Sequence, residues 1–118
     1  MTTEPVVRIS KGHFAPEHYE SVRKLIDASA GPLVPALKQL RGLLYYVASV
    51  DPITNTVVNV SIWSDLAAAE QMDTLQPMLA QRPILEGGGV RFDKIANYEP
   101  IWVINRGLAA AGIVQIEP

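Results

Sequence analysis

The chain has 118 residues, with 10 basic and 12 acidic side chains, a net charge of −2 and no cysteine. This length predicts one domain with a single core. The lack of cysteine excludes disulfides, thiol nucleophiles and cysteine-ligated metals, and the weakly acidic balance argues against a nucleic-acid partner. Hydrophobic residues make up 48% of the chain. Such a share indicates either a very full core or apolar surface covered by a partner.

No targeting or membrane-spanning segment is expected. The first ten residues include Glu4 and Arg8 but no long apolar run, so no secretory signal is visible. The longest apolar stretches, residues 101–104 and the broken stretch 108–116, fall well short of the roughly 20 residues that cross a bilayer. The cytoplasm is therefore the expected compartment, and no membrane partner is expected.

The first part of the chain predicts a strand and then helices. Residues 6–9 are a short β-rich run. From Pro16 to Ser29, apolar residues recur at steps of three and four, which is typical of an amphipathic helix. We expect Gly31-Pro32 to end that helix and residues 33–40 to form a second, shorter one.

The middle of the chain predicts a hairpin and then a broken helix. Residues 42–50 and 56–63 are strand-like, and turn-forming residues separate them. Ser64 and Asp65 both offer side-chain oxygens that can cap a helix beginning at Leu66. The helix is expected to continue to residue 85 in short pieces, because prolines interrupt it.

The last predicted strand completes an α+β fold. Residues 90–98 form a fourth strand, which residues 101–104 extend or supplement with a fifth. The order β–α–β–β–α–β predicts a ferredoxin-like fold, with a four-stranded antiparallel sheet covered on one face by two helices. The other face is left bare, so we expect a homodimer through it. The domain is expected to span residues 1–104, and the apolar tail, residues 105–118, is expected to pack on the partner subunit.

The third strand carries the most informative pattern, because side chains in a strand alternate between two faces. One face is uniformly apolar and suits packing under helices. The other mixes an amide, a hydroxyl and an indole, as small-molecule pockets do, and is predicted to line a pocket on the face away from the helices. The alternative is a solvent-exposed face with one tryptophan. The apolar set is Val58, Val60 and Ile62; the mixed set is Val57, Asn59, Ser61 and Trp63.

The element order, together with the segment NVSIWSDLAAAE (residues 59–70), resembles the antibiotic biosynthesis monooxygenase (ABM) family. The resemblance implies a dimeric α/β barrel in which two protomers pack sheet to sheet. It also implies that Asn59 and Trp63 hold an aromatic substrate, the amide as a donor to a phenolate or enolate oxygen and the indole as a wall. The implied reaction is a cofactor-free oxygenation of a small aromatic or polyketide-like phenol.

Haem chemistry, which other members of this superfamily perform, is not expected here. Haem-degrading relatives need a histidine on the helix after the third strand and an asparagine on the first strand. Residues 66–85 contain no histidine, and residues 6–10 contain no asparagine. Two alternatives to the oxygenase remain: a homodimer of the same fold that binds a ligand or has only a structural role, and an isomerase or lyase acting on a small ring compound.

The histidines, tyrosines and arginines supply the remaining candidates. His13 and His18 are either exposed loop residues or acid–base groups at the pocket mouth, and their spacing predicts no metal site. Tyr45 and Tyr46 point to opposite faces, so only one can bind substrate beside Ser61, and the strand register decides which. Packing in the core is the alternative role for either tyrosine, and the favoured one. Arg82 and Arg91 are candidates for attracting an acidic substrate, with a solvated surface position or an ion pair as the alternative.

Overall fold

The structure, a computed structural model, describes residues 4–104. The predicted ferredoxin-like α+β fold is confirmed, with five strands in place of four. The sheet is antiparallel in the order β2-β3-β1-β4, and β5 also pairs with β1. The elements are β1 (Val6–His13), η1 (Pro16–His18), α1 (Tyr19–Lys38), β2 (Leu43–Asp51), β3 (Thr56–Trp63), α2 (Leu66–Glu70), η2 (Gln71–Asp73), α3 (Gln76–Gly87), β4 (Arg91–Phe92) and β5 (Ala96–Tyr98).

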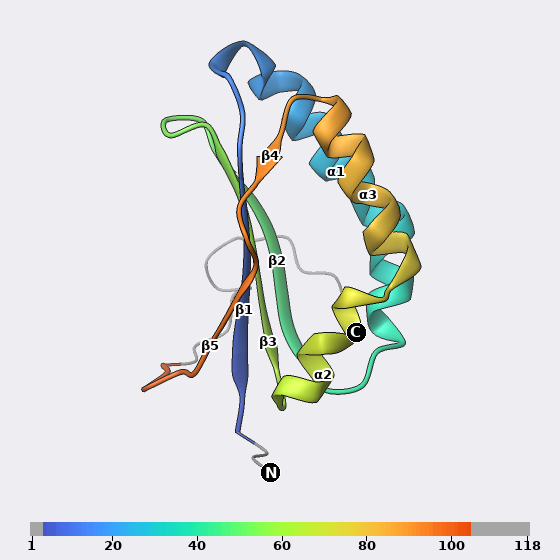
Figure 1. Ribbon diagram of the computed structural model, residues 1–118, viewed down its shortest axis with the longest axis vertical. Helices are drawn as coiled ribbons and strands as arrows, with labels where there is room; N and C mark the ends of the chain where they lie inside the picture. The colour runs from blue at the N-terminus through green and yellow to red at the C-terminus, as the bar shows by residue number, and fades with distance from the viewer. Residues whose placement is uncertain (1–3, 105–118) are drawn as a thin grey trace.

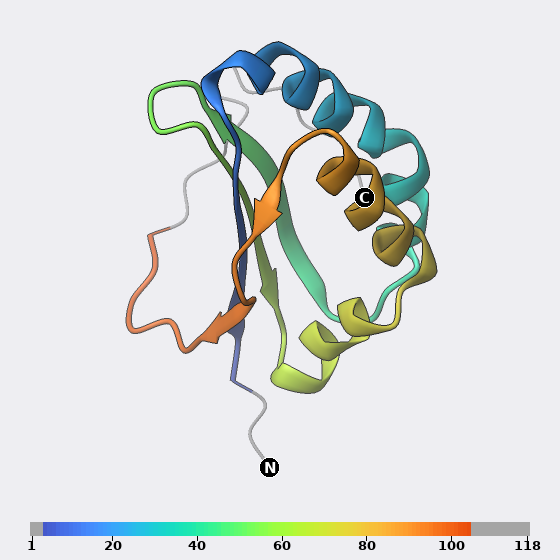
Figure 2. The same cartoon turned by 45° about the horizontal axis from the view of Figure 1, so that its top comes forward.

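The molecule has two layers. All the helices lie on one face of the sheet, and α3 runs beside α1 (Figures 1 and 2). The opposite face has no helix over it in the described part of the chain. Of the helices within residues 4–104, none is both long and apolar enough to span a membrane.

The helix α1 differs from the prediction, because Gly31-Pro32 does not end it. It continues to Lys38 with Pro32 and Pro35 in its interior. An interior proline costs about 3 kcal/mol or more. Leu33 and Leu37, which follow Pro32 in the helix, are buried in the core, and burying each leucine contributes roughly 1.5–3 kcal/mol. Packing therefore offsets much of the local cost, and the predicted second helix is the end of the first.

The strands also differ in length from the prediction. β1 runs on to His13 rather than ending at residue 9. The predicted fourth strand divides into β4 and β5, which pair with two different stretches of β1. Residues 101–104 form no strand and are exposed, so the expected extension there is wrong. The tail 105–118 lies outside the described residues.

The core shows that the predicted orientation of β3 is wrong. Trp63 is 0% exposed and belongs to a cluster with Leu33 and Leu37 of α1 and with residues of α2. Val57 is buried in a second cluster, with residues of α1 and α3. The mixed set of β3 therefore faces the helices, and the uniformly apolar set, which is half-buried, faces the other way.

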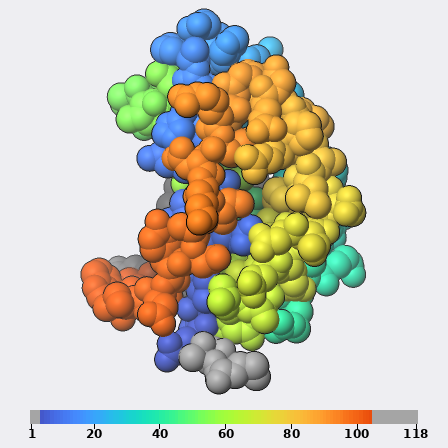
Figure 3. Space-filling model, viewed as in Figure 1, coloured from blue at the N-terminus to red at the C-terminus, as the bar shows by residue number. Residues whose placement is uncertain are grey.

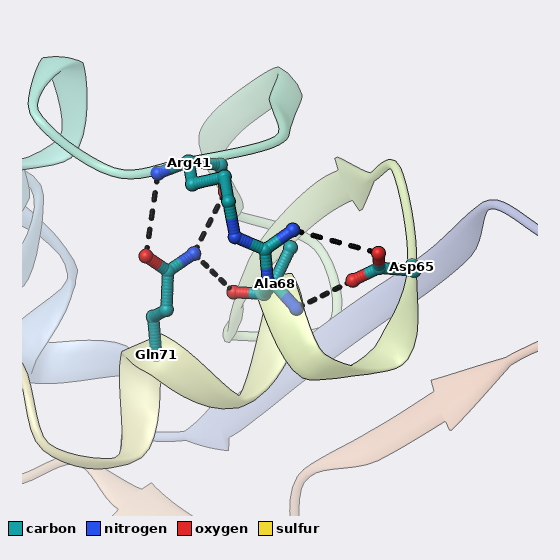
Figure 4. A network of polar contacts seen from close by, with 4 residues as sticks. All are labelled: Arg41, Asp65, Ala68 and Gln71. Atoms are coloured by element: carbon teal, nitrogen blue, oxygen red, sulfur yellow. Dashed lines mark hydrogen bonds and ion pairs between the residues drawn. The ribbon is translucent and has the colours of Figure 1, made fainter. Parts of the chain in front are cut away.

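A polar network ties the turn before β2 to the short helices after β3 (Figure 4). The Asp65 side chain accepts a hydrogen bond from the backbone N–H of Ala68 at 2.8 Å, which confirms the predicted cap. The Gln71 amide donates to the carbonyls of Arg41 and Ala68, each at 2.7 Å. Next to Arg41, Gly42 has φ +77°, and a Cβ there would collide with Ser64. These contacts hold η2 in place over the sheet.

Replacing Trp63 with alanine is expected to lower the free energy of unfolding by about 3–5 kcal/mol, because the indole fills the core between the sheet, α1 and α2. Urea unfolding followed by far-UV circular dichroism measures the change. Trp63→Phe is expected to lose less. Ile53→Ala, in the β2–β3 turn at a side chain 87% exposed, is the control and should stay within about 0.5 kcal/mol of the parent. Equal stability of Trp63→Ala and the parent would contradict the buried role of the indole.

Candidate functional site

A pocket of about 300 Å³ lies between the sheet and the η2–α3 segment. Its floor is the helix-facing side of β1, β2 and β3, and its walls come from η2, α3, β4 and the residues that follow β4. In Figure 3 the orange β4–β5 segment and the yellow η2–α3 segment lie on either side of this region. Such a volume is at the lower end of the range for small-molecule sites. The lining residues are Arg8, Ser10, Tyr46, Asn59, Ser61, Met72, Asp73, Met78, Leu79, Gln81, Arg82, Leu85, Phe92, Asp93 and Ile95.

Asn59 brings an unsatisfied amide to the pocket. Its Oδ1 atom is buried and makes no hydrogen bond to any residue within 4–104. A buried polar atom without a partner costs about 1–3 kcal/mol, so native structures rarely keep one without a reason. Asn59 lies in the middle of β3, opposite Ser10 of β1 and Ala48 of β2. The unpaired amide is therefore available to a ligand in the pocket.

Arg8 brings a buried positive charge to the same floor. It is 7% exposed, and its Nη2 donates to Oδ1 of Asp73 at 2.8 Å. The Asp73 side chain, in η2, is 58% exposed. This is the one side-chain hydrogen bond that Arg8 makes within the described residues, although a guanidinium has five N–H groups. The arginine is thus desolvated while its carboxylate partner is largely in water.

Tyr46 enters the pocket because of a register shift in β2. Leu43 is opposite Trp63, but the irregularity between Leu43 and Tyr45 makes Tyr45 the partner of Ile62 and Tyr46 the partner of Ser61. Tyr46 therefore faces the helices. Burial raises the pKa of its hydroxyl to about 12, and the nearby charge of Arg8 acts in the opposite direction. Tyr46 is a hydrogen-bond donor at neutral pH and not a base.

The structure separates the predicted site residues. Asn59, Ser61 and Tyr46 line the pocket, whereas Tyr45 lies on the opposite face of the sheet. Arg82 also lines the pocket, and its Nε donates to the Glu86 carboxylate at 3.3 Å. Trp63 does not line the pocket. Its indole is a core group whose Nε1 donates to the Ser61 hydroxyl at 2.8 Å, so the predicted aromatic wall is wrong.

The two histidines and Arg91 lie outside the pocket lining. His18 ends η1 and sits against Gly89, while Arg91 is exposed on β4 opposite His13. His13 is nevertheless linked to the pocket, because its Nε2 lies 2.8 Å from Oδ2 of Asp93, which is a lining residue. The predicted acid–base role of a histidine at the pocket mouth stays a prediction, and this contact with Asp93 is what connects His13 to the pocket.

Several pocket residues escaped the sequence reasoning. Arg8 lies in an apolar strand, where alternation places it on the same face as Val6, and Asp73 and Gln81 lie on helices far along the chain. The one signal in the sequence that points to Arg8 is its charge, since the other residues of the 6–9 run are apolar. Within residues 4–104, no group of three or more histidine, aspartate or glutamate side chains could hold a metal ion.

The fold is similar to those of several solved structures. A candidate antibiotic biosynthesis monooxygenase from Deinococcus radiodurans aligns over 86% of this chain and 98% of its own, with TM-score 0.65 and 24% identity. Rv0793 from Mycobacterium tuberculosis aligns over 86% and 100%, with TM-score 0.65 and 16% identity. SnoaB, a cofactor-independent oxygenase from Streptomyces nogalater, aligns over 87% and 99%, with TM-score 0.57 and 16% identity.

The chain has the ABM fold. The resemblance that residues 59–70 indicate is thereby confirmed at the level of the fold. No protein-family model and no curated protein matches the chain. At these identities the likeness concerns architecture, and the chemistry of the site has to be argued from the residues of the pocket.

The raised pKa of Tyr46 predicts a loss of stability at high pH. Below pH 10 the hydroxyl is protonated in both the folded and the unfolded chain, but between pH 10 and about 12 only the unfolded chain releases the proton. The free energy of unfolding should therefore fall across this window, and it should fall less in Tyr46→Phe. Urea unfolding from pH 9 to 11.5 measures the difference, and Tyr45→Phe, on the opposite face, controls for loss of a hydroxyl. Parallel curves for the parent and Tyr46→Phe would contradict the burial of Tyr46.

Proposed function

We propose that this protein is a monooxygenase of the ABM type that oxygenates a small phenolic compound without a cofactor. The observation that carries the proposal is the buried, unpaired Oδ1 atom of Asn59 on the floor of the pocket. The ABM fold and the likeness to an oxygenase that needs no cofactor support the class of reaction.

The polar groups of the pocket suit a phenolate. Arg8 supplies a desolvated positive charge, and the Tyr46 hydroxyl, protonated at neutral pH, can donate a hydrogen bond. The Asn59 amide can bind the substrate oxygen with its N–H₂ or accept a substrate hydroxyl with its carbonyl. Such groups stabilise negative charge that develops on oxygen, and they do so most strongly in a site that excludes water. Met78, Leu85 and neighbouring side chains would hold the apolar ring.

In the proposed reaction the substrate supplies the electrons. A phenolate activates an adjacent CH₂ carbon, which loses a proton, and the carbanion reduces dioxygen and forms a C–O bond with it. Loss of water then leaves a carbonyl, so that CH₂ and O₂ become C=O and H₂O. The protein's part is to deprotonate, orient and shield the substrate.

The proposed proton acceptor is the Asp93–His13 pair. Asp93 lines the pocket, and His13 Nε2 lies 2.8 Å from the Asp93 carboxylate. Both side chains are partly exposed, so a proton accepted there can pass to water. Histidine is the side chain that most often transfers protons in enzymes. This role extends the sequence-based hypothesis for His13 and leaves His18 without one.

Oxygen uptake with a hydroxylated anthrone, a phenol with an activated methylene, tests the proposal. The parent protein should raise the rate above the spontaneous oxidation measured without protein. Asn59→Ala should lower the protein-dependent rate by about 100-fold, because it removes a preorganised partner of the reacting oxygen. The carbonyl product is identified by mass spectrometry.

Gln39→Ala is the control for this experiment, because Gln39 is an exposed amide side chain at the end of α1, outside the pocket lining. It should keep the parental rate. No uptake above the spontaneous rate by the parent protein, with the anthrone bound, would reject the oxygenase in favour of a binding protein of the same fold.

We also propose that two copies pair through the open face of the sheet. That face carries half-buried or exposed apolar side chains from four strands and no helix in the described part of the chain. An apolar area of this kind is typical of an interface. Its residues are Val7 and Ile9 of β1, Tyr45 and Val47 of β2, Val58, Val60 and Ile62 of β3, and Ala96 and Tyr98 of β5.

The dimer is tested by analytical ultracentrifugation at micromolar concentration. The parent should sediment with the mass of two chains, and Val60→Lys, which places a charge in the centre of the open face, should shift it toward one chain. Lys24→Ala, a change at an exposed position of α1 on the other side of the molecule, should remain dimeric. A parent protein with the mass of one chain would exclude this assembly.

A further inference from the structure

We propose that Arg8 makes the pocket selective for an aromatic ligand that carries a carboxylate. This inference rests on the proposed function, because it takes the substrate to bind in this pocket, and it adds that the substrate carries a carboxylate. The ligand class follows from a buried cation on the floor, an unpaired amide oxygen close to it on the neighbouring strand, and the apolar side chains of the facing wall.

The burial of Arg8 is the first step of the argument. Its side chain is 8% exposed, so most of the water that would solvate a guanidinium is absent. A buried charge needs a paired and hydrogen-bonded partner, and replacing water at such a group is costly. Yet within residues 4–104 the side chain makes one hydrogen bond, from Nη2 to Asp73. The other N–H groups of the fork have capacity left for an acceptor in the pocket.

The second step concerns the partner of Arg8. Asp73 lies in the short helix η2 at the edge of the pocket, and its side chain is 58% exposed. The Asp73 carboxylate can therefore rotate toward the solvent at little cost in free energy, unlike a carboxylate that is held in the core. A ligand carboxylate can then share or take over the guanidinium, whose planar fork matches a carboxylate through two parallel hydrogen bonds.

The third step is the rest of the lining. On β3, Asn59 and Ser61 face the helices beside Arg8, since Ser61 pairs directly with Arg8 and Asn59 with Ser10. A ring that carries a hydroxyl next to its carboxylate could therefore meet the guanidinium and the free amide together. The opposite wall is largely apolar and suits the face of an aromatic ring: Met72, Met78, Leu79 and Leu85.

A pair of probes that differ in the carboxylate tests the inference: 1-hydroxy-2-naphthoate and 1-naphthol. Their binding is measured by isothermal titration calorimetry without dioxygen, so that turnover does not contribute. The parent should bind the acid about 10- to 100-fold more tightly than the neutral probe, the effect of a hydrogen bond to a charged group. In Arg8→Met, which keeps an apolar stem, the two affinities should become equal within about threefold.

Asp73→Asn distinguishes recognition from a structural role. It breaks the same ion pair as Arg8→Met, so a merely structural pair would predict weaker binding of both probes in both variants. If Arg8 recognises the ligand carboxylate, Asp73→Asn removes the carboxylate that competes with the ligand for the guanidinium. This variant should then bind the acid several-fold more tightly than the parent does. Because Asp73 is mostly exposed, Arg8→Met leaves no buried lone carboxylate, and the variant should fold.

Arg41→Met is the matched control. Arg41 is also paired with an aspartate, at 3.5 Å from Asp65, but lies outside the pocket lining, so the same loss of charge should leave the preference for the acid unchanged. Equal affinity of the parent for the two probes, no binding of the acid up to millimolar concentration, or an unchanged preference in Arg8→Met would each overturn the inference. Oxygen uptake is read separately, so selective binding without uptake would reject the proposed reaction and retain this role of Arg8.

Discussion

The indole of Trp63 is fully buried between β3, the second half of α1 and α2, and the orientation of the sheet depends on it. Because side chains alternate along a strand, burying Trp63 under the helices turns Ser61 and Asn59 to the same side. The Ser61 hydroxyl satisfies the indole N–H, so the core and the pocket floor share a hydrogen bond. Tight packing at one end of β3 thus sets the position of the polar groups in its middle.

The pocket combines apolar and polar side chains. The wall from η2 and α3 places apolar side chains beside Asp73, Gln81 and Arg82, and the floor carries a guanidinium, a phenol and an amide on three adjacent strands. Arg8 is paired with a carboxylate that itself is largely exposed, and burial raises the pKa of the Tyr46 hydroxyl to about 12. In this low-dielectric setting each group interacts more strongly with a ligand than it would at the surface. These features favour an electron-rich, acidic ring.

Much of the fold follows from local patterns. The β2–β3 hairpin, the Asp65 cap and the order of strands and helices are all readable, since alternation, turn residues and caps act over a few residues. The continuation of α1 through Pro32 is not, because the burial of Leu33 and Leu37 that offsets the proline comes from distant parts of the chain. The orientation of β3 is not readable for a related reason. The pattern predicts that its uniformly apolar face packs under the helices, yet this face forms the open side of the sheet.

The amino-acid sequence alone determined the ferredoxin-like α+β class and the ABM resemblance. It also pointed to Asn59, Ser61 and one of two tyrosines as residues of a pocket. The tertiary structure decided which side of the sheet holds the pocket and which tyrosine enters it, because one irregularity in β2 reverses the faces of Tyr45 and Tyr46. It also brought Arg8 to Asp73 across 65 residues of chain. Periodicity reports how side chains alternate within an element, whereas the packing partner of each face is set by contacts between elements that are distant in sequence.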